Sequence, residues 1–345
     1  MLILLYIIGT LAAILVIFIA IAMIKDYRPA ARETLQDLSA TAGDSKGPIT
    51  DSLSILCWNI GYAGLGDDMD FFYDGGTQVR CSRQRTLQNM DGIISEIRRH
   101  DADIILLQEV DESSRRSWGI DEVDMLRKAF PGYHLYFAYN YKSFFVPIPL
   151  KAPLGKVASG VVIMSRYRPD EVHRWQYPSR FAWPVSMFNL KRCLMTASFT
   201  LADGSRLIIG NTHNTAYDTG NMRTVETGFL GKMLDSLHAE GSRFVIGGDW
   251  NQYPAAYTPS EKENSNPHFS TVRLDEDLLG SHGHVVYDPN VRTLRHLDTV
   301  YGPESVLTLT DFFFVSDSMD IRSIQAFDLH FSNSDHQPVL LKTRL

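Results

Sequence analysis

The sequence predicts an α/β fold: a four-layer α/β sandwich of two packed β-sheets with outer helices, preceded by one N-terminal transmembrane helix. Along residues 53–345, short apolar runs typical of strands alternate with stretches of helical periodicity. The first 24 residues carry no charged side chain. The chain has 44% hydrophobic and 21% charged residues, which provides for a sizeable core and excludes global disorder.

The first segment, residues 1–24, is long enough to cross a bilayer, because ~20 apolar helical residues span a hydrocarbon layer of ~30 Å. A cleaved signal peptide is the alternative, since Ala20-Ile21-Ala22 resembles a small-x-small cleavage site. The apolar run is longer than a usual signal-peptide core and lacks a basic start, so a transmembrane anchor is favoured. Residues 25–52 show little periodicity and are expected to be a tether.

The orientation of the anchor depends on the charges that follow it. Lys25, Arg28 and Arg32 would keep the catalytic domain cytoplasmic by the positive-inside rule. Asp26 and Glu33 are interspersed among them, and large folded domains often follow signal anchors outward. We therefore expect an extracytoplasmic domain, membrane-anchored by the single N-terminal helix.

Two stretches of helical periodicity each precede a predicted strand. Residues 84–99 repeat apolar side chains at helical spacing before the short apolar run 104–107. Residues 225–237 do the same before the run 244–246, with Gly241 as the predicted helix stop.

Further strands are predicted at 161–164, 194–200 and 307–315, with a hairpin turn at Ala202-Asp203-Gly204-Ser205. Residues 53–345 are expected to form one domain, because the polar motifs described next lie at both of its ends. Three cysteines without metal-type spacing imply no disulfide framework.

Polar residues stand where six of these strand segments begin or end. They are Asn59, Glu109, His213, Asp249, Asn251, Asp311, Asp335 and His336. Carboxylates, amides and imidazoles are the groups that bind hard cations and phosphates. Any one of these short motifs can occur by chance. All of them, in one order across a whole domain, are strong evidence for a single functional site.

In this order the chain resembles the endonuclease/exonuclease/phosphatase superfamily, which includes pancreatic-type DNases, abasic-site endonucleases, neutral sphingomyelinases and inositol polyphosphate 5-phosphatases. The resemblance rests on a strand ending in Asn59, on Gln108-Glu109, on Gly248-Asp249-Trp250-Asn251, and on Ser334-Asp335-His336. It runs from about Leu53 to Leu345 and implies the same sandwich fold.

The resemblance also implies a divalent metal ion, Mg²⁺ or alternatively Mn²⁺. Glu109 is the expected primary ligand, assisted by the side-chain carbonyl of Asn59. Asp335 is expected to complete this site or to hold a second ion. One carboxylate with few helpers is sufficient for Mg²⁺, because this ion keeps several of its waters.

The catalytic residues follow from the same resemblance. Asp249 is expected to position or deprotonate the attacking water, and Asn251 to hold the phosphorus oxygens. His336 resembles the family's phosphate-polarising or acid histidine, with Asp311 behind its ring to orient it and favour its charged form. His213 matches a histidine of the DNase, sphingomyelinase and 5-phosphatase branches.

The substrate is predicted only as a class. The resemblance implies a Mg²⁺-dependent phosphodiesterase acting on nucleic acid or on a phospholipid headgroup, with no protein partner. The net charge of −7 argues mildly against a specialist in DNA binding. Two alternatives stay open: a phosphomonoesterase of the inositol polyphosphate phosphatase type, and a catalytically inert, membrane-anchored binding module.

Several segments could contribute to substrate binding. Arg80, Arg83 and Arg85 form one basic cluster, and Lys191-Arg192 a second, which could clamp phosphates or simply face solvent. The aromatic stretch 133–156 could stack bases, dip into a lipid headgroup layer, or form a core strand followed by a proline-stiffened loop. The glycine-rich segment Gly61 to Gly76 is interpreted as an insertion, because it does not map on to the well-known branches of the family.

Overall fold

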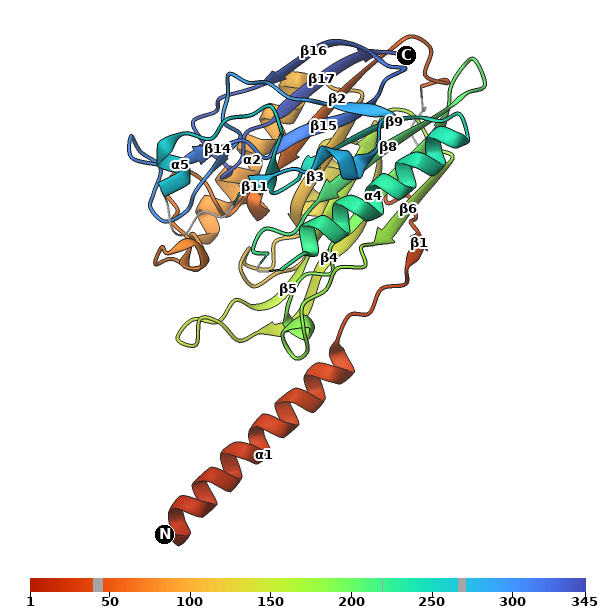
Figure 1. Ribbon diagram of the computed structural model, residues 1–345. Helices are drawn as coiled ribbons and strands as arrows, with labels where there is room; N and C mark the ends of the chain where they lie inside the picture. The colour runs from red at the N-terminus through yellow and green to blue at the C-terminus, as the bar shows by residue number, and fades with distance from the viewer. Residues whose placement is uncertain (40–45, 219, 266–270) are drawn as a thin grey trace.

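The computed structural model describes residues 1–39, 46–218, 220–265 and 271–345, and contains two large β-sheets with helices on their outer faces (Figure 1). The seven-stranded sheet has the order β1 (Arg32–Thr34), β6 (Glu171–Gln176), β7 (Cys193–Thr200), β8 (Arg206–His213), β9 (Arg243–Asp249), β15 (Asp311–Ser316) and β12 (Gly283–Val286). The six-stranded sheet has the order β16 (Asp320–Ala326), β17 (Val339–Arg344), β2 (Ser52–Asn59), β3 (Ile104–Asp111), β5 (Gly155–Ser165) and β4 (His134–Val146).

Smaller elements complete the domain. The α-helices after the N-terminal one are α2 (Arg83–His100), α3 (Glu122–Ala129), α4 (Met222–Ala239) and α5 (Glu261–Ser265). Among the described residues, the 3-10 turns are η1 (Gly61–Ala63), η2 (Phe72–Asp74), η3 (Val185–Phe188) and η4 (Glu276–Leu279). Two short two-stranded ladders pair β10 (Gln252–Tyr253) with β11 (Val272–Arg273), and β13 (Leu294–Arg295) with β14 (Leu307–Thr308).

The core has three apolar layers, which together define four layers of secondary structure. Ile55 and Cys57 of β2 point into the layer between the sheets, where they join residues such as Val245 of β9. Leu56 and Trp58 of the same strand point the other way, against α2 and α3. This alternation follows from the two-residue repeat of a strand. A third layer packs α4 on the outer face of the seven-stranded sheet, which confirms the predicted sandwich.

Helix boundaries agree with the predicted stretches to within a turn. Helix α2 begins after Ser82, whose hydroxyl accepts a hydrogen bond from the Arg85 amide at 3.1 Å, as expected of an N-cap. It ends at Asp101, whose backbone is left-handed. Helix α4 ends just before Gly241, the predicted stop.

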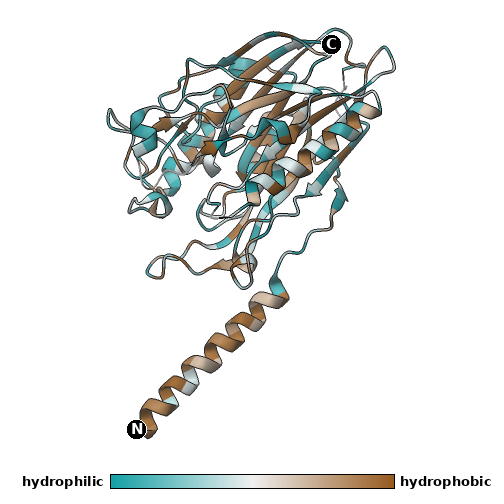
Figure 2. Cartoon of the chain, in the orientation of Figure 1, coloured by the Kyte–Doolittle hydropathy of each residue, from teal (hydrophilic) through white to brown (hydrophobic). Residues whose placement is uncertain are grey.

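Helix α1 (Leu2–Lys25) projects away from the domain and is coloured almost entirely as hydrophobic (Figure 2). Among the described residues it is the one helix long and apolar enough to cross a membrane, a test that a signal sequence also passes. Part of the segment expected to be a tether is ordered against the domain. Residues 32–34 form β1, which pairs with β6, and the Leu38 amide donates to the Leu135 carbonyl at 2.7 Å.

Candidate active site

The polar residues singled out in the sequence come together because the strands that carry them end at the same edge of the two sheets. His213 and Asp249 end the parallel strands β8 and β9 and are paired in register. Asp311 begins the antiparallel strand β15 directly opposite Asp249. From the other sheet, Asn59 ends β2 and Glu109 lies in the neighbouring β3.

These strand ends surround one pocket with a volume of about 310 Å³. Six of the eight predicted residues line it: Glu109, His213, Asp249, Asn251, Asp335 and His336. Asn59 and Asp311 are buried behind this layer, 1% exposed each, where they contact the residues that face the pocket. The sequence order therefore corresponds to one site in space.

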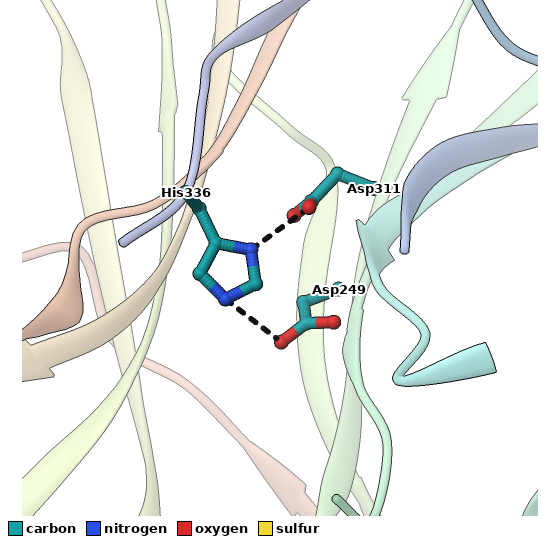
Figure 3. Close-up of side chains that lie close together, drawn as sticks. All are labelled: Asp249, Asp311 and His336. Atoms are coloured by element: carbon teal, nitrogen blue, oxygen red, sulfur yellow. Dashed lines mark hydrogen bonds and ion pairs between the residues drawn. The ribbon is translucent and has the colours of Figure 1, made fainter. Parts of the chain in front are cut away.

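The imidazole of His336 lies between two carboxylates (Figure 3). Its Nδ1 is 2.8 Å from Asp311 Oδ2, and its Nε2 is 3.7 Å from Asp249 Oδ2. Burial by itself would lower the pKa of His336, but the charges of Asp311 and Asp249 outweigh it and raise the pKa to about 10. His336 is therefore an imidazolium at neutral pH, as the predicted phosphate-facing ring requires.

Asp249, Asp311 and His336 are close enough together to suggest a metal site, since one ligand atom from each lies within 4.8 Å of the others. Both nitrogens of the His336 ring already face carboxylates of this group, Nδ1 toward Asp311 and Nε2 toward Asp249. We therefore interpret these three residues as an ion-pair network, in which Glu109 and Asp335 have no part and are the carboxylates open to a cation.

Two amides hold the Asp249 carboxylate in place. Asn59 Nδ2 donates to Asp249 Oδ2 at 3.1 Å, and the Asn251 amide donates from its backbone to Oδ1 at 2.9 Å and from its side chain to Oδ2 at 3.1 Å. Asn251 reaches this position with a left-handed backbone, at a φ of 50°. Burial raises the pKa of Asp249, and the charge of His336 opposes this shift. A carboxylate with a raised pKa is a better proton acceptor for a water molecule.

Glu109 faces the pocket because β3 is irregular at this point. The register of β3 with β5 shifts between Leu107 and Val110, and Glu109 has a left-handed φ of 52°. A bulge of this kind redirects a side chain that a regular strand would place on the other face. The Glu109 carboxylate is a quarter exposed and lies 3.7 Å from the Arg116 guanidinium and 3.9 Å from His213 Nε2.

Asp335 is the second carboxylate on this side of the pocket. Burial raises the pKa of Asp335, His336 counteracts this, and the negative charge of Glu109 raises it again, to about 7 in total. Gly61 permits the close approach, because its φ is +51° and a Cβ there would lie 2.7 Å from Asp335 Oδ1. Only a glycine at position 61 leaves room for the Asp335 carboxylate.

The donor set fits a hard divalent cation. Glu109 and Asp335 repel one another, and a cation bound between like charges removes that repulsion. Asn59 Oδ1 accepts a hydrogen bond from the Gly61 amide at 3.1 Å, which leaves it one further lone pair. Oxygen donors of this type match Mg²⁺ or Mn²⁺ better than softer metals.

His213 differs from His336 in its charge. Burial lowers the pKa of His213 well below its usual value, and the nearby charges of Arg192, His336 and Arg116 add to the effect. The ring is therefore neutral. Its Nε2 lies 3.4 Å from Asp249 Oδ2, and its Nδ1 lies 3.5 Å from the amide of Asn140.

Some functional candidates were not apparent from the sequence. The guanidinium of Arg116 is buried, donates to Asp111 through Nε at 3.2 Å and Nη2 at 3.0 Å, and lies 3.6 Å from the ring centre of Tyr62. Asn140 lines the pocket beside His213. A lone Arg in a loop carries no motif, so only the folded chain identifies it.

The predicted basic clusters have different positions. Arg192 lines the pocket and is 7% exposed, whereas Lys191 pairs with Asp26 at 3.2 Å. Arg85 of the first cluster pairs with Asp67 at 2.5 Å and Asp68 at 3.1 Å. A guanidinium with two carboxylate partners is already neutralised, which agrees with the interpretation of this cluster as a surface feature.

The glycine-rich segment from Gly61 to Gly76 forms one wall of the pocket. It contributes Tyr62, Leu65, Phe71, Tyr73 and Asp74, which all line the cavity. The Arg295 guanidinium fastens the segment by donating to three of its backbone carbonyls.

Comparison with known proteins places the chain in a family. The profile of the Endonuclease/Exonuclease/phosphatase family matches residues 56–336. The chain belongs to this family, whose members are hydrolases acting on phosphoester bonds. No curated protein sequence matches the chain significantly.

Solved structures share the fold at low sequence identity. An endonuclease/exonuclease/phosphatase from Beutenbergia cavernae is similar with a TM-score of 0.57 and 18% identity, over 86% of this chain and 72% of that one. ANGEL2, a 2′,3′-cyclic phosphatase, gives 0.55 and 16% identity over 92% and 99%. TDP2 of D. rerio, solved with a single-strand DNA product, gives 0.52 and 15% identity over 85% and 99%.

Proposed function

We propose that this chain is a Mg²⁺-dependent phosphodiesterase, with Mn²⁺ as the alternative ion, whose catalytic domain of residues 53–345 is held at a membrane by residues 1–24. One observation supports this most strongly. The imidazolium of His336 and the carboxylate of Asp249 lie 3.7 Å apart in the same pocket as the carboxylates of Glu109 and Asp335. The pocket thus combines a proton acceptor, a cationic hydrogen-bond donor and two carboxylates to which we assign the cation.

The residues that we propose to be catalytic each have a defined task. Asp249 orients a water and accepts its proton as the water oxygen bonds to phosphorus and the ester oxygen leaves. His336 donates hydrogen bonds to the charge that develops on the phosphoryl oxygens, with Asp311 fixing its ring. The neutral ring of His213 positions the phosphate. Asn251 assists it by releasing one of the two amide hydrogen bonds that its side chain donates to Asp249 and to the Asn214 carbonyl.

Glu109 and Asp335, with Asn59, would hold the metal, which supplies Lewis-acid stabilisation of the phosphoryl and leaving oxygens. Arg116 lies beside Glu109 and also lines the pocket, where its charge favours an anionic substrate. Removal of Glu109 is therefore expected to affect metal affinity first.

Two proteins of similar fold are described by their ligand or activity: TDP2 of D. rerio is complexed with a single-strand DNA product, and ANGEL2 is a 2′,3′-cyclic phosphatase. We propose a phosphodiester of nucleic acid or of a phospholipid headgroup as substrate, with the domain on the extracytoplasmic side. A phosphomonoester of the inositol polyphosphate type is the second candidate. The intact set of pocket residues argues against an inert binding module.

The test is a substrate panel on the full chain in detergent, containing plasmid DNA, RNA, sphingomyelin and a phosphoinositide. Wild type is compared with His336→Asn and with Glu171→Gln, which removes an exposed carboxylate on β6. Turnover of one substrate that is lost in His336→Asn, kept in Glu171→Gln and abolished by chelator supports the proposal. Activity that is indifferent to His336 contradicts the mechanism, and silence across the panel favours the binding module.

A further inference from the structure

Two loops at the end of the domain nearest α1 expose large apolar side chains. The first is the β4–β5 connection, residues 147–154, and the second is the segment 178–192 around η3. Their exposed apolar residues are Ile148 at 37%, Leu150 at 87%, Trp183 at 63% and Val185 at 49%. Figure 1 shows both loops projecting toward the end of α1. We call these four residues the docking surface.

The C-terminal part of α1 contacts the segments that carry this surface. The ring of Phe18 stacks on Phe188, with centroids 5.6 Å apart and planes inclined by 5°. It also lies 5.9 Å from the ring of Phe144 and 6.2 Å from that of Phe145. Beyond the end of the helix, Asp26 pairs with Lys191 at 3.2 Å. The C-terminal part of α1 therefore packs against the segments from which the two loops project.

The depth of Phe18 in a bilayer follows from helix geometry. Phe18 precedes Lys25, the first charged residue, by seven positions, which is ~10 Å along the helix axis. A tilt of ~40° still leaves ~8 Å. Since half of a hydrocarbon layer is ~15 Å thick, Phe18 lies inside the hydrocarbon when α1 spans it. The rings of Phe144 and Phe188, in contact with Phe18, must then lie at the hydrocarbon boundary or below it.

The charge of the two loops points to the same partner. Residues 134–156 and 177–192 contain no Asp or Glu, in a chain with a net charge of −7. The exposed cations of these stretches are Lys142, Lys151 and Lys156 in the first and Arg180 in the second. Lys191 and Arg192 do not face headgroups, because Lys191 pairs with Asp26 and Arg192 is buried beside the pocket. Apolar tips flanked by exposed cations match a bilayer surface, where apolar side chains enter the boundary and cations remain among the headgroup phosphates.

We propose that the docking surface inserts into the same leaflet from which α1 emerges, so that the catalytic domain rests on the phospholipid bilayer at a fixed angle. The partner is the bilayer itself. Leu154 and Leu190, which line the pocket, belong to the two loops that carry the docking surface. The surface that contacts lipid and the wall of the pocket are thus continuous, and docking fixes how the pocket is presented to the membrane.

The test measures the depth of single nitroxide labels on the full chain in phosphatidylcholine vesicles containing phosphatidylserine. The native cysteines are all buried, which favours labelling at an introduced one. Leu150→Cys reports the docking surface. Asp203→Cys is the matched control, because it lies far from the docking surface. Strand β7 begins at residue 193, directly after the second loop, and Asp203 lies in the turn that follows the strand. The length of β7 places this turn about 23 Å from residue 193. Both positions are exposed, so neither substitution opens a cavity.

The Leu150 label is expected to be accessible to oxygen dissolved in the lipid and shielded from a water-soluble nickel complex, with the opposite result for the Asp203 label. Equal exposure of both labels to the nickel complex would overturn the proposal, as would failure of the chain to sediment with the vesicles. Trp183 supplies a second readout without a label. Lipids with brominated acyl chains should quench the emission of Trp183 in the wild type. Trp183→Phe lacks this residue, so a smaller share of its tryptophan emission should be quenched. Equal quenching in the wild type and the variant would count against docking. None of these readouts depends on catalysis.

Discussion

His336 is the residue whose chemistry is most strongly set by its surroundings. Its ring contacts carboxylates from two adjacent strands, and these raise its pKa to about 10 despite burial. His213 is about as deeply buried, and burial lowers its pKa, with the charges of Arg192, His336 and Arg116 adding to the effect. The two histidines of one pocket thus take opposite protonation states, and the roles proposed for them, as charged donor and neutral positioning group, rest on this difference.

Asp311→Asn tests this assignment. The substitution removes one of the two charges that raise the pKa of His336, so that the ring loses its proton at lower pH than in wild type. We expect a fall of about 10²–10⁴-fold in kcat/KM and an alkaline limb of the pH–rate profile that moves toward acid. A variant that loses activity with an unshifted alkaline limb would show that Asp311 acts only on folding.

As a proposed metal ligand, Asp335 is expected to make metal binding dependent on pH. Its pKa of about 7 means that protons compete with the metal below neutrality, so Mg²⁺ affinity should fall about tenfold per pH unit below that value. Calorimetric titration of the full chain with Mg²⁺ in buffers of different ionisation enthalpy would also detect the released proton. In Glu109→Gln the pKa of Asp335 is expected to fall, because its negative neighbour is gone. A Mg²⁺ affinity that stays constant from about pH 5 to about pH 8, across the range in which such a carboxyl group titrates, would contradict this role.

At the level of elements, close approaches between backbones position the strands and helices around the pocket. Gly231 of α4 lies against η4, where an added Cβ would be 1.8 Å from the Leu278 carbonyl. Gly248 of β9 lies against β8, with a Cβ position 2.0 Å from the Thr212 carbonyl. The second contact holds the strand that ends in Asp249 beside the strand that ends in His213.

Gly231→Ala should therefore destabilise the fold by about 1–3 kcal/mol, because the helix must move away from η4. Gly228→Ala in the same helix is the matched control, since a Cβ there meets nothing within 4 Å. It should stabilise the helix by about 0.5–1 kcal/mol. Denaturant unfolding of both variants checks this, and equal effects in the two would show that the contact with η4 contributes nothing.

The strand ends were predictable from the sequence because an apolar run followed by a polar residue shows where a strand stops. The positions of Asn59, His213 and Asp249 follow from that pattern alone. The orientation of Glu109 does not, since it depends on a bulge opposite β5 that leaves no mark in the sequence. Arg116 could not be predicted either, because its pairing with Asp111 arises only once the loop after β3 folds back. The strand β1, formed by residues 32–34, was missed for another reason: three residues are too few to show a period.

At the scale of the whole molecule, one chain carries both the pocket and the proposed membrane anchor. Helix α1 has a mean hydropathy of 3.0 over its most apolar window and no buried residue within that window. The order in residues 32–38 leaves few residues between the helix and the domain, which limits how far the domain can move from the bilayer.

Alkaline carbonate extraction of cell membranes distinguishes an anchor from a signal peptide. We expect the full-length chain in the membrane pellet, because a spanning helix resists carbonate. A shorter, soluble chain beginning after Ala22 would show that the segment is cleaved, and the docking surface would then have to bind the bilayer alone.

We propose that phosphodiester hydrolysis by this chain requires a divalent cation held by Glu109. The most direct measurement is the initial rate of hydrolysis of an artificial bis-aryl phosphodiester by the full chain, titrated with Mg²⁺ after removal of metal by chelator. Wild type should recover activity with Mg²⁺, Glu171→Gln should match it, and Glu109→Gln should need far more Mg²⁺ or remain inactive. Hydrolysis that persists in chelator, or a Glu109→Gln chain with the wild-type Mg²⁺ dependence, would contradict the account.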